Sequence, residues 1–307
     1  MTESGSPSPT SAVVVHYGPW TSTTRTLRSL SRAAPGVPVL LVDNSASAAP
    51  WGDREAPAGV RLLQPGRNVG YGAACNLAAR ESAARFLLFL NNDVELEPGS
   101  LEAMVSTLEE EKGVAAVGPR LYDSRRRPVR SIFRAPSPRR VLFESLFLPR
   151  LLPGIPFFHG HHTALTSHTR ARDVETLSGA VVLVRRDAFE QVGGFDEAFF
   201  FYAEESDLFA RLHRSGWRVR YQPSARAVHP GGVASAEVTR EELDRRLNEA
   251  LRLYARRHHG PRGERQTTRA LLWGARLRWA LAHLAPGERG RRRRRRYAAI
   301  LRASSSR

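Results

Sequence analysis

The first hundred residues alternate short apolar runs with amphipathic or alanine-rich stretches, a pattern that predicts strands and helices in turn. Two of the runs, 37–43 and 85–90, are almost continuously hydrophobic, as in strands that are covered on both faces of a parallel sheet. The predicted strands are 12–17, 37–43, 60–64 and 85–90, and the predicted helices are 20–32, 73–84 and 99–112. We therefore expect an α/β fold with a mostly parallel sheet.

Three of these predicted strands end in polar residues. They are His16 and Tyr17 at the end of the first strand, Asp43 and Asn44 at the end of the second, and 91–93 at the end of the fourth. In open parallel sheets, ligands bind in the crevice outside the carboxyl ends of the strands. We therefore expect these side chains to converge on one site.

Between residues 119 and 172 the alternation disappears, and the sequence becomes rich in proline, arginine and histidine. We predict that this segment is a variable insertion that carries a mobile loop. Its histidines, His159, His161, His162 and His168, superficially suggest zinc, but a proline-rich loop without cysteine makes that the less favoured interpretation. Later predicted strands are 176–184, 217–222 and 226–229, and later predicted helices are 187–191, 203–215, 237–257 and 267–283.

The chain has a formal net charge of +17 and a pI near 11.3. Such a charge is typical of proteins that meet nucleic acid, an anionic membrane surface or phosphorylated substrates. Almost all of the basic residues are arginine, with Lys112 as the single lysine, and 289–296 are arginine except for Gly290. Much of the excess charge therefore belongs to the C-terminal region rather than to the α/β core.

The C-terminal helices also carry apolar residues among their arginines, and Trp273 and Trp279 are the largest of them. Basic residues beside interfacial aromatic side chains favour a peripheral anchor on an anionic membrane. The alternative is that these helices pack on the catalytic domain and that their arginines are only solvated.

The single cysteine, Cys75, excludes an intrachain disulfide and favours a reducing compartment. Residues 1–11 are rich in serine, proline and threonine and lack the charged and apolar segments of a signal peptide, so we expect a short disordered tail. No apolar stretch is long enough to span a bilayer. We expect a cytoplasmic protein, with the inner face of the cell membrane as a peripheral location.

Asp93 comes directly after the apolar run 85–90, where a buried strand would hold its carboxylate at the crevice. Mg²⁺ and Mn²⁺ prefer oxygen ligands and commonly bind one or two carboxylates together with phosphate oxygens. A metal-binding role for Asp93 therefore suits an enzyme with a diphosphate leaving group. The alternative is an ordinary turn, because Asn91, Asn92 and Asp93 are residue types that favour turns.

Four aromatic residues, 199–202, precede Glu204, Glu205 and Asp207 at the start of a predicted helix. One of these carboxylates is a candidate general base for an acceptor hydroxyl, at the edge of an apolar wall that stacks on a sugar. The alternative is structural, because acidic residues stabilise the first turn of any helix and Asp207 with Arg211 is an ordinary i,i+4 pair.

Two further polar residues end predicted strands. The Asp43 carboxylate is suited to accept a hydrogen bond from a nucleobase or ribose, or to cap the turn that follows it. His229, before Pro230, is a candidate metal ligand, although a single histidine at such a place is more often only a polar or core residue.

Seven motifs occur in a fixed order between residues 12 and 232. They are VVVHY, VLLVDNSAS, GRNVGYGAACNLA, LFLNNDVELEPGSL, LSGAVVLVRRDAF, VGGFDEAFFFYAEESDLFARLHRSGW and the terminal AVH. Together they resemble the inverting family 2 glycosyltransferases with the GT-A fold, and especially the bacterial rhamnosyltransferase-like branch.

The resemblance implies a GT-A catalytic domain at 12–232, Rossmann-like, with a mostly parallel central sheet flanked by helices. Segment 119–172 would be its variable insertion and acceptor loop. Residues 1–11 would be a disordered tail and 233–307 a helical, arginine-rich C-terminal appendage.

The resemblance also implies roles for individual residues, with Glu205 as the base and Glu204 as its catalytic neighbour. Asp93 matches the last acid of a DXD-type metal motif whose first acid is replaced here by Asn91. His229 matches a histidine that completes the metal site, which would hold Mg²⁺ or Mn²⁺. The implied donor-binding residues are Asp43, Arg67, Asn68, Gly70, Asn76, Asn92 and Asp93, and the implied acceptor-side residues are Ser178, Gly179, Asp196, Tyr202 and Asp207.

The implied reaction is a single displacement in which a nucleotide-diphosphate sugar, with rhamnose favoured, is transferred to a hydroxyl of a glycan or lipid-linked acceptor. Glu205 would take the hydroxyl proton, and the configuration at the anomeric carbon would invert. Two other functions stay open: a nucleotidyltransferase with a similar sheet, and a basic nucleic-acid-binding protein. The first generally needs a glycine-rich phosphate loop near the first strand, where this chain has Gly18, Pro19 and Trp20 instead.

Overall fold

The computed structural model describes residues 8–45, 56–158, 160–161, 169–231 and 238–305 of the 307-residue chain. The contacts of the chain divide it into two compact units. Unit 1 is Met1–Phe133 with Ala164–Glu237, and unit 2 is Arg134–Thr163 with Val238–Arg307. The sequence-based division kept all of 119–172 in the catalytic domain, whereas the contacts group 134–163 with the C-terminal residues.

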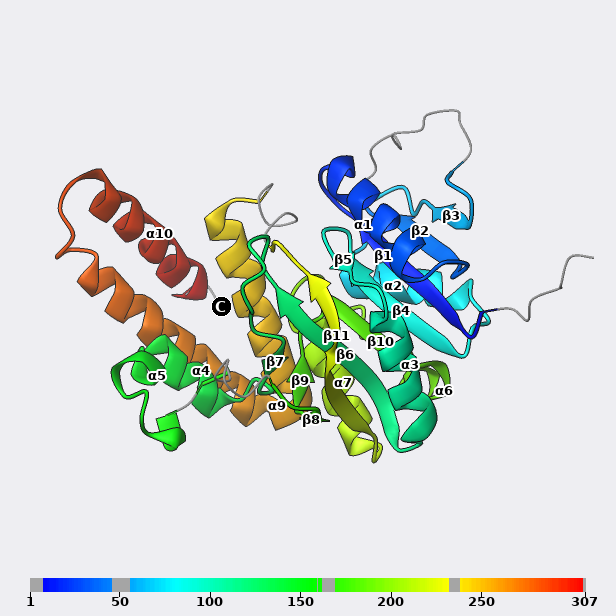
Figure 1. Ribbon diagram of the computed structural model, residues 1–307. Coiled ribbons are helices and arrows are strands. Elements are labelled where there is room, and N and C mark those ends of the chain that lie inside the picture. Colours follow the sequence, from blue (N-terminus) through cyan, green and yellow to red (C-terminus); the bar gives the residue numbers. More distant parts are fainter. Residues whose placement is uncertain (1–7, 46–55, 159, 162–168, 232–237, 306–307) are drawn as a thin grey trace, which may run out of the picture. The chain divides into compact units, whose positions relative to one another are not determined.

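Unit 1 contains a nine-stranded sheet among its described residues, in the order β3-β2-β1-β4-β10-β6-β11-β5, with β8 beside β11 (Figure 1). Six strands run in one direction, and β10, β5 and β8 run against them. The predicted α/β fold with a mostly parallel sheet is therefore confirmed. The strands are β1 Thr10–His16, β2 Val39–Asp43, β3 Val60–Leu63, β4 Phe86–Asn91, β5 Glu95–Leu96, β6 Val114–Tyr122, β8 Arg172–Asp173, β10 Val181–Arg185 and β11 Arg218–Val228.

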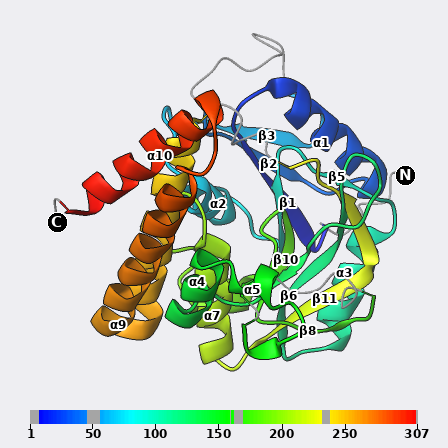
Figure 2. The same cartoon turned by 90° about the vertical axis from the view of Figure 1, so that its left-hand side faces the viewer.

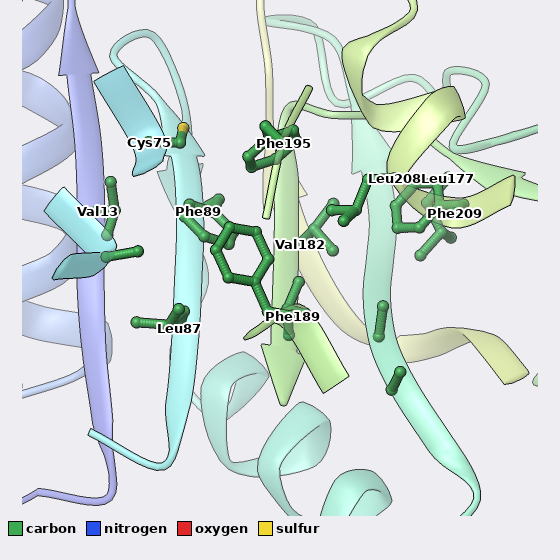
Figure 3. Close-up of a cluster of buried hydrophobic side chains, with 14 of the residues drawn as sticks. Val13, Cys75, Leu87, Phe89, Leu177, Val182, Phe189, Phe195, Leu208 and Phe209 are labelled. Atoms are coloured by element: carbon green, nitrogen blue, oxygen red, sulfur yellow. The ribbon is translucent and has the colours of Figure 1, made fainter. Parts of the chain in front are cut away.

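Helices cover both faces of this sheet because successive strand residues point to opposite sides. Val13, Leu87 and Phe89 pack against α2, α6 and α7 (Figure 3), whereas Val14 and Leu88 pack against α1 and α3. Burial on both faces explains the continuous apolar runs that predicted these strands. The helices of unit 1 are α1 Trp20–Ala33, α2 Tyr71–Arg80, α3 Ser100–Glu110, α6 Arg186–Gln191 and α7 Glu204–Arg214.

The strand register brings the predicted polar ends together at one edge of the sheet. His16 at the end of β1 pairs with Asp43 at the end of β2, and Val15 pairs with Asn91 at the end of β4. Because β10 runs the other way, its first residue, Val181, lies at this same edge, opposite Leu90. The segment before β10 therefore joins the carboxyl ends of the parallel strands.

Several elements differ from the sequence-based prediction, and three of the differences concern strands of the sheets. Strand β6 was not predicted, because Gly118 and Pro119 interrupt its apolar pattern. The single strand expected at 176–184 is two strands in different sheets, β9 Thr176–Leu177, which pairs with β7 Ile132–Phe133, and then β10. The two strands expected at 217–222 and 226–229 are the one strand β11, with an irregularity between Gln222 and Arg226. The predicted irregular segment 119–172 thus holds several regular elements, and its residues 159 and 162–168 lie outside the described residues.

Unit 2 consists of helices from two distant stretches of the chain. Helix α9 is capped by Thr239, whose Oγ1 accepts a hydrogen bond from the Glu242 backbone N–H at 3.2 Å, and it kinks at Gly260 (φ 66°), just before Pro261. Helix α10 lies along α9 (Figure 2). No helix among the described residues has both the length and the apolar character needed to cross a bilayer. The elements are α4 Pro138–Ser145, α5 Leu148–Leu151, the 3-10 helix η1 Pro156–Phe158, α9 Arg240–Leu281 and α10 Gly287–Ser305.

Candidate active site

Helix α7 begins with the acidic pair Glu204 and Glu205, after a sharp change in chain direction. Tyr202 (φ 72°) and Ala203 (φ 66°) both have positive φ angles, which non-glycine residues rarely adopt and which cost about 1–3 kcal/mol each. The surrounding fold must hold this strained turn in place. It follows that the position of the two glutamates is fixed by tertiary packing and not by local preference.

The two glutamates have different surroundings. Glu204 is buried, and its Oε2 has no hydrogen-bond partner among the described residues. Burial, and then the charge of Glu205, raises the pKa of Glu204 well above its ordinary value. Glu205 is only partly buried, and desolvation raises its pKa as well. Of the two residues, Glu205 is therefore the less buried one.

Glu205 lies against the segment that precedes β10. A Cβ built on Gly179 would stand 3.4 Å from Cγ of Glu205, so the Gly179 backbone flanks this side chain directly. The Tyr71 hydroxyl donates to the Gly179 carbonyl oxygen at 3.5 Å. Burial raises the pKa of the Tyr71 phenol well above its ordinary value, so the phenol stays protonated and neutral. The structure thus brings together Glu205, Gly179 and Tyr71.

Asparagine side chains tie the ends of β2 and α2 together on the predicted donor side. Asn44 Nδ2 donates to Asn68 Oδ1 at 3.0 Å, and the same oxygen accepts the Gly70 N–H at 2.9 Å. The Val69 N–H donates to Asn44 Oδ1 at 2.8 Å. This network fixes the loop that leads into α2, while Arg67 on that loop is exposed.

Gly70 makes a close approach that no other residue type permits. Its φ and ψ of 88° and 160° lie in a region that is essentially restricted to glycine. A Cβ at this position would lie 2.8 Å from the backbone oxygen of Phe200, and that same oxygen accepts the Tyr71 N–H at 3.4 Å. Gly70 therefore lets the loop before α2 contact the aromatic segment that leads to the glutamates.

The ends of β1 and β2 form a second polar group at the same sheet edge. His16 Nδ1 lies 2.7 Å from Thr23 Oγ1, and the His16 ring stacks on Trp20 with centroids 3.5 Å apart. Burial lowers the pKa of His16 to about 4, against the opposing charge of Asp43, so the imidazole is neutral at neutral pH. Asn92 Nδ2 donates to Thr23 Oγ1 at 3.1 Å and to the Tyr17 carbonyl at 2.9 Å.

Asp43 has one satisfied and one unsatisfied carboxylate oxygen. Its Oδ1 accepts hydrogen bonds from the Ser45 N–H at 3.1 Å and the Ser45 hydroxyl at 2.7 Å. Its Oδ2 is buried without a hydrogen-bond partner among the described residues. A buried acceptor of this kind is costly unless a ligand donor satisfies it.

Asp93 and His229 lie side by side at the same edge. Asp93 Oδ1 is 3.2 Å from His229 Nε2, and the His229 backbone N–H donates to the Tyr122 carbonyl at 2.8 Å. One carboxylate and one imidazole suit a divalent cation that takes its remaining ligands from phosphate oxygens or water. No set of three or more histidine, cysteine, aspartate or glutamate side chains in the described part of the chain is arranged to hold a metal. The two residues therefore fit a partial metal site.

Several of the other predicted site residues have partners within the protein. Asp207 is buried and pairs with Arg211 at 2.6 Å, which is the structural alternative weighed for this residue. Asn76 donates to the Phe195 carbonyl at 2.9 Å, and Asp196 Oδ1 accepts the Ala198 N–H at 3.0 Å. Ser178 and Tyr202 flank the Gly179 and Glu205 pair in sequence and are both partly buried. The donor-side role of Asn76 and the acceptor-side roles of the other residues stay predictions.

Tyr71 and Trp20 are residues of this region that the sequence did not single out. Tyr71 opens a helix of ordinary alanine-rich composition, and Trp20 opens α1, so neither stands in a pattern that marks a site. The fold places Tyr71 beside Gly179, just before β10, and Trp20 beside His16, at the end of β1. These contacts cannot be read from the sequence.

The chain is similar in sequence to several known proteins. The family described as "Glycosyltransferase like family 2" matches residues 7–260. The N-acetylglucosaminyl-diphospho-decaprenol L-rhamnosyltransferase of Mycobacterium tuberculosis (strain ATCC 25618 / H37Rv) is 32% identical over 282 residues, which is 88% of each chain. The low-salt glycan biosynthesis hexosyltransferase Agl10 of Haloferax volcanii is 24% identical over 205 residues, 65% of this chain and 61% of its own.

A solved structure shares the fold. The mannosyltransferase PcManGT from Pyrobaculum calidifontis, crystallised with GDP-Man and Mn²⁺, superposes with a TM-score of 0.53 at 15% identity. The match covers 98% of this chain and 82% of the mannosyltransferase.

Proposed function

The chain belongs to the glycosyltransferase-like family 2, and on that premise we propose that it moves a sugar, rhamnose by preference, from a nucleotide-diphosphate donor to a hydroxyl of a lipid-linked glycan. Its similarity to a mycobacterial rhamnosyltransferase, whose name describes a diphospho-decaprenol substrate, supports both the sugar and the kind of acceptor. Such an acceptor would bring the enzyme to the cytoplasmic face of a cell membrane, as part of cell-surface polysaccharide assembly.

The observation that carries this proposal is the position of Glu205. This partly buried residue stands beside Gly179, at the edge where β1, β2 and β4 end. A general base must reach the proton that it removes, and its pKa should lie near the working pH. Glu205 satisfies the first condition better than the buried Glu204, and its raised pKa moves it toward the second.

The proposed reaction is a single displacement with inversion. One Glu205 carboxylate oxygen accepts the proton of the acceptor hydroxyl as that oxygen forms its bond to the anomeric carbon. The bond between the anomeric carbon and the diphosphate breaks on the opposite face, and the electron pair leaves with the diphosphate. Burial and the charge of Glu205 raise the pKa of Glu204, which favours the neutral form of Glu204 beside the base.

The donor would lie along the ends of β1 and β2. The unsatisfied Oδ2 of Asp43 is suited to accept a hydrogen bond from the base or ribose of the nucleotide. The loop that Asn44 and Asn68 fix would line the nucleotide pocket, with Arg67, Gly70, Asn76 and Asn92 around it, as the resemblance implies.

Asp93 and His229 would hold a divalent cation, Mg²⁺ or Mn²⁺. When bound, such a cation supplies charge neutralisation to the departing diphosphate. The fit rests on the 3.2 Å separation of one carboxylate oxygen and one imidazole nitrogen. With asparagine at 91 and 92, the protein offers one acid in this motif, so the donor's phosphate oxygens would complete much of the coordination.

Substitution of Glu205 tests the proposal directly. We first identify a donor by thermal-shift screening of nucleotide sugars with Mg²⁺ and Mn²⁺, followed by transfer assays on those that bind. Glu205→Gln should then lower the transfer rate by about 10²-fold or more, because general-base catalysis contributes about that much, with donor affinity unchanged.

Glu204→Gln is the matched control, since it makes the same change one residue away. A rate near wild type in the Glu205 variant would show that this residue is not the base. If the Glu204 variant lost more activity, the base would have to be Glu204.

A further inference from the structure

The two units differ completely in charge. Unit 2 holds 24 of the 47 basic residues but only seven of the 30 acidic residues, so it carries the whole net charge of +17. Unit 1 holds 23 residues of each sign and is neutral. The basic character of the protein is therefore confined to one unit and is not a general property of its surface.

Exposed apolar side chains are concentrated in the same unit. Among the described residues, ten large hydrophobic side chains are exposed, and nine of them belong to unit 2, with Phe200 as the exception. Trp273 is 58% exposed and Leu284, in the turn between α9 and α10, is 80% exposed. Apolar residues gathered on a strongly charged unit indicate an interaction surface.

One face of the second half of α9 combines the two kinds of residue. The spacings of three and four put five exposed residues on one side of the helix. Glu264, the one acidic residue between 261 and 281, is partly buried and lies 3.9 Å from Arg256. We name this set the docking face: Arg262, Arg265, Arg269, Trp273 and Arg276.

Helix α10 adds arginines beside this helix (Figure 2). Arg294 and Arg296 have structural roles, because Arg294 donates to the Ala282 carbonyl at 3.0 Å and Arg296 pairs with Asp244. Arg289, Arg291, Arg293 and Arg295 are exposed, and no acidic side chain among the described residues pairs with them. The run of arginines is thus divided into an inner part that anchors α10 and an outer part that is open to a partner.

We propose that unit 2 docks on an anionic phospholipid membrane through the docking face and the exposed arginines of α10. Arginine side chains near such a surface are attracted to its headgroups, while tryptophan and leucine insert at the interface. This inference rests on the proposed function in one respect: a lipid-linked acceptor is the reason for the enzyme to bind a membrane. A membrane explains the exposed leucine and tryptophan together with the charge.

Two other occupants fit these observations less well. A second copy of the chain would bring two units of +17 against each other, which repulsion opposes. Nucleic acid would satisfy the arginines, but it gains nothing from an aliphatic side chain as exposed as Leu284.

Vesicle co-sedimentation tests the proposal with a closely matched pair of variants. Arg262→Gln, Arg265→Gln and Arg269→Gln are combined in one full-length variant. Arg25→Gln, Arg28→Gln and Arg32→Gln, three exposed arginines with the same spacing on α1 of unit 1, are combined in the control. Point substitutions are preferable to removal of the C-terminus, because α9 packs against α4.

Binding is measured to phosphatidylcholine vesicles with and without about one-third phosphatidylglycerol, in the absence of donor and acceptor. Each arginine near an anionic surface contributes about a fivefold change in partitioning, so the α9 variant should bind about 10²-fold more weakly and the α1 control should bind like wild type. Binding should also fall steeply as salt is added.

A second measurement reports on Trp273 itself. Lipids with brominated acyl chains quench tryptophan fluorescence on contact, so the wild type should be quenched on binding. Trp273→Phe should lose a distinct part of that quenching, although the chain holds five tryptophans.

The proposal is overturned if the anionic and neutral vesicles bind equally, or if the α9 and α1 variants behave alike. It is also overturned if a single-stranded oligonucleotide binds and vesicles do not, or if sedimentation shows self-association that the α9 variant abolishes. The vesicles contain no substrate, so such a result leaves the proposed sugar transfer to be judged by the Glu205 variant alone.

Discussion

The fold buries the carboxyl group of Glu204, and burial disfavours its ionised form. Its pKa is raised by burial and by Glu205, so the folded protein favours the protonated form at a pH where the unfolded chain is already ionised. The stability that this group contributes is complete below the unfolded pKa and is lost as the pH rises through the folded pKa. A residue retained at such a cost is typical of a functional site.

Glu204→Gln should therefore change the pH dependence of stability. The variant cannot ionise, so relative to wild type its free energy of unfolding should increase between about pH 4 and about pH 8, by about 1.4 kcal/mol for each pH unit by which the pKa is raised. Urea unfolding at the two pH values measures the difference, with the exposed Glu110→Gln as control. Parallel pH profiles for wild type and Glu204→Gln would contradict the prediction.

Asp93 supplies the only carboxylate of the segment 91–93, so its loss should abolish metal-dependent donor binding. With Asp93→Ala, calorimetric titration of the donor should give the same weak affinity with and without Mg²⁺ or Mn²⁺, because His229 alone offers one ligand atom. Glu95→Gln, two residues further on, should keep the metal dependence. Unchanged metal-dependent binding in the Asp93 variant would exclude its proposed role.

At the scale of elements, the entry into α2 depends on one glycine. Gly70→Ala must either displace the Phe200 backbone, 2.8 Å from the new Cβ, or abandon its glycine-only conformation. Gly66→Ala is a matched control, because Gly66 also has a positive φ (74°) but no atom within 4 Å of the new Cβ.

We expect Gly70→Ala to lower the free energy of unfolding by at least about 1–2 kcal/mol more than Gly66→Ala does, and to weaken donor binding as well. Urea unfolding and donor titration measure the two effects. Equal losses in both variants would mean that the contact with Phe200 relaxes without cost.

The elements that could be predicted are those with an uninterrupted pattern. Strands β2 and β4 are buried on both faces, and burial leaves a continuous apolar run that the sequence displays. Strand β6 is as deeply buried, but Gly118 and Pro119 within it are residues that ordinarily end strands. Its central position is determined by its neighbours β10 and β11, which lie far away in the sequence.

The same distinction applies to the site. The strand-end residues Asp43 and Asp93 follow recognisable strands, so their place at one sheet edge followed from the pattern. The contact of Tyr71 with Gly179 joins residues 108 positions apart, and no local pattern contains it. The strained turn at Tyr202 and Ala203 also opposes local preference, so only the assembled fold could reveal it.

At the scale of the whole molecule, the chain combines a neutral unit with a strongly basic one. Like charges in unit 2 repel one another, and this repulsion favours opening of its helices unless salt screens it. Unit 1 carries no net charge and has no such sensitivity.

Salt should therefore stabilise the units unequally. Between about 0.1 M and about 0.5 M NaCl, amide hydrogens of α10 should exchange several-fold more slowly, and those of β1 and β4 should be unaffected. Hydrogen exchange followed by mass spectrometry resolves the two regions in one experiment. A uniform response, or none in α10, would show that repulsion among its arginines does not limit its stability.

Unit 2 is formed by two separate stretches of the chain, and the ribosome synthesises one of them well before the other. Arg278 of α9 donates a 2.8 Å hydrogen bond to the Ser145 carbonyl of α4, across 133 residues of chain. At about 5–20 residues per second, a ribosome needs on the order of ten seconds to synthesise that stretch. During this interval the partner helix of α4 is not yet complete. Val141 and Phe143 of α4, which are buried in the folded protein, therefore lack their packing partners. The protein therefore emerges with an early hydrophobic segment that chaperones can bind before the last helices are translated.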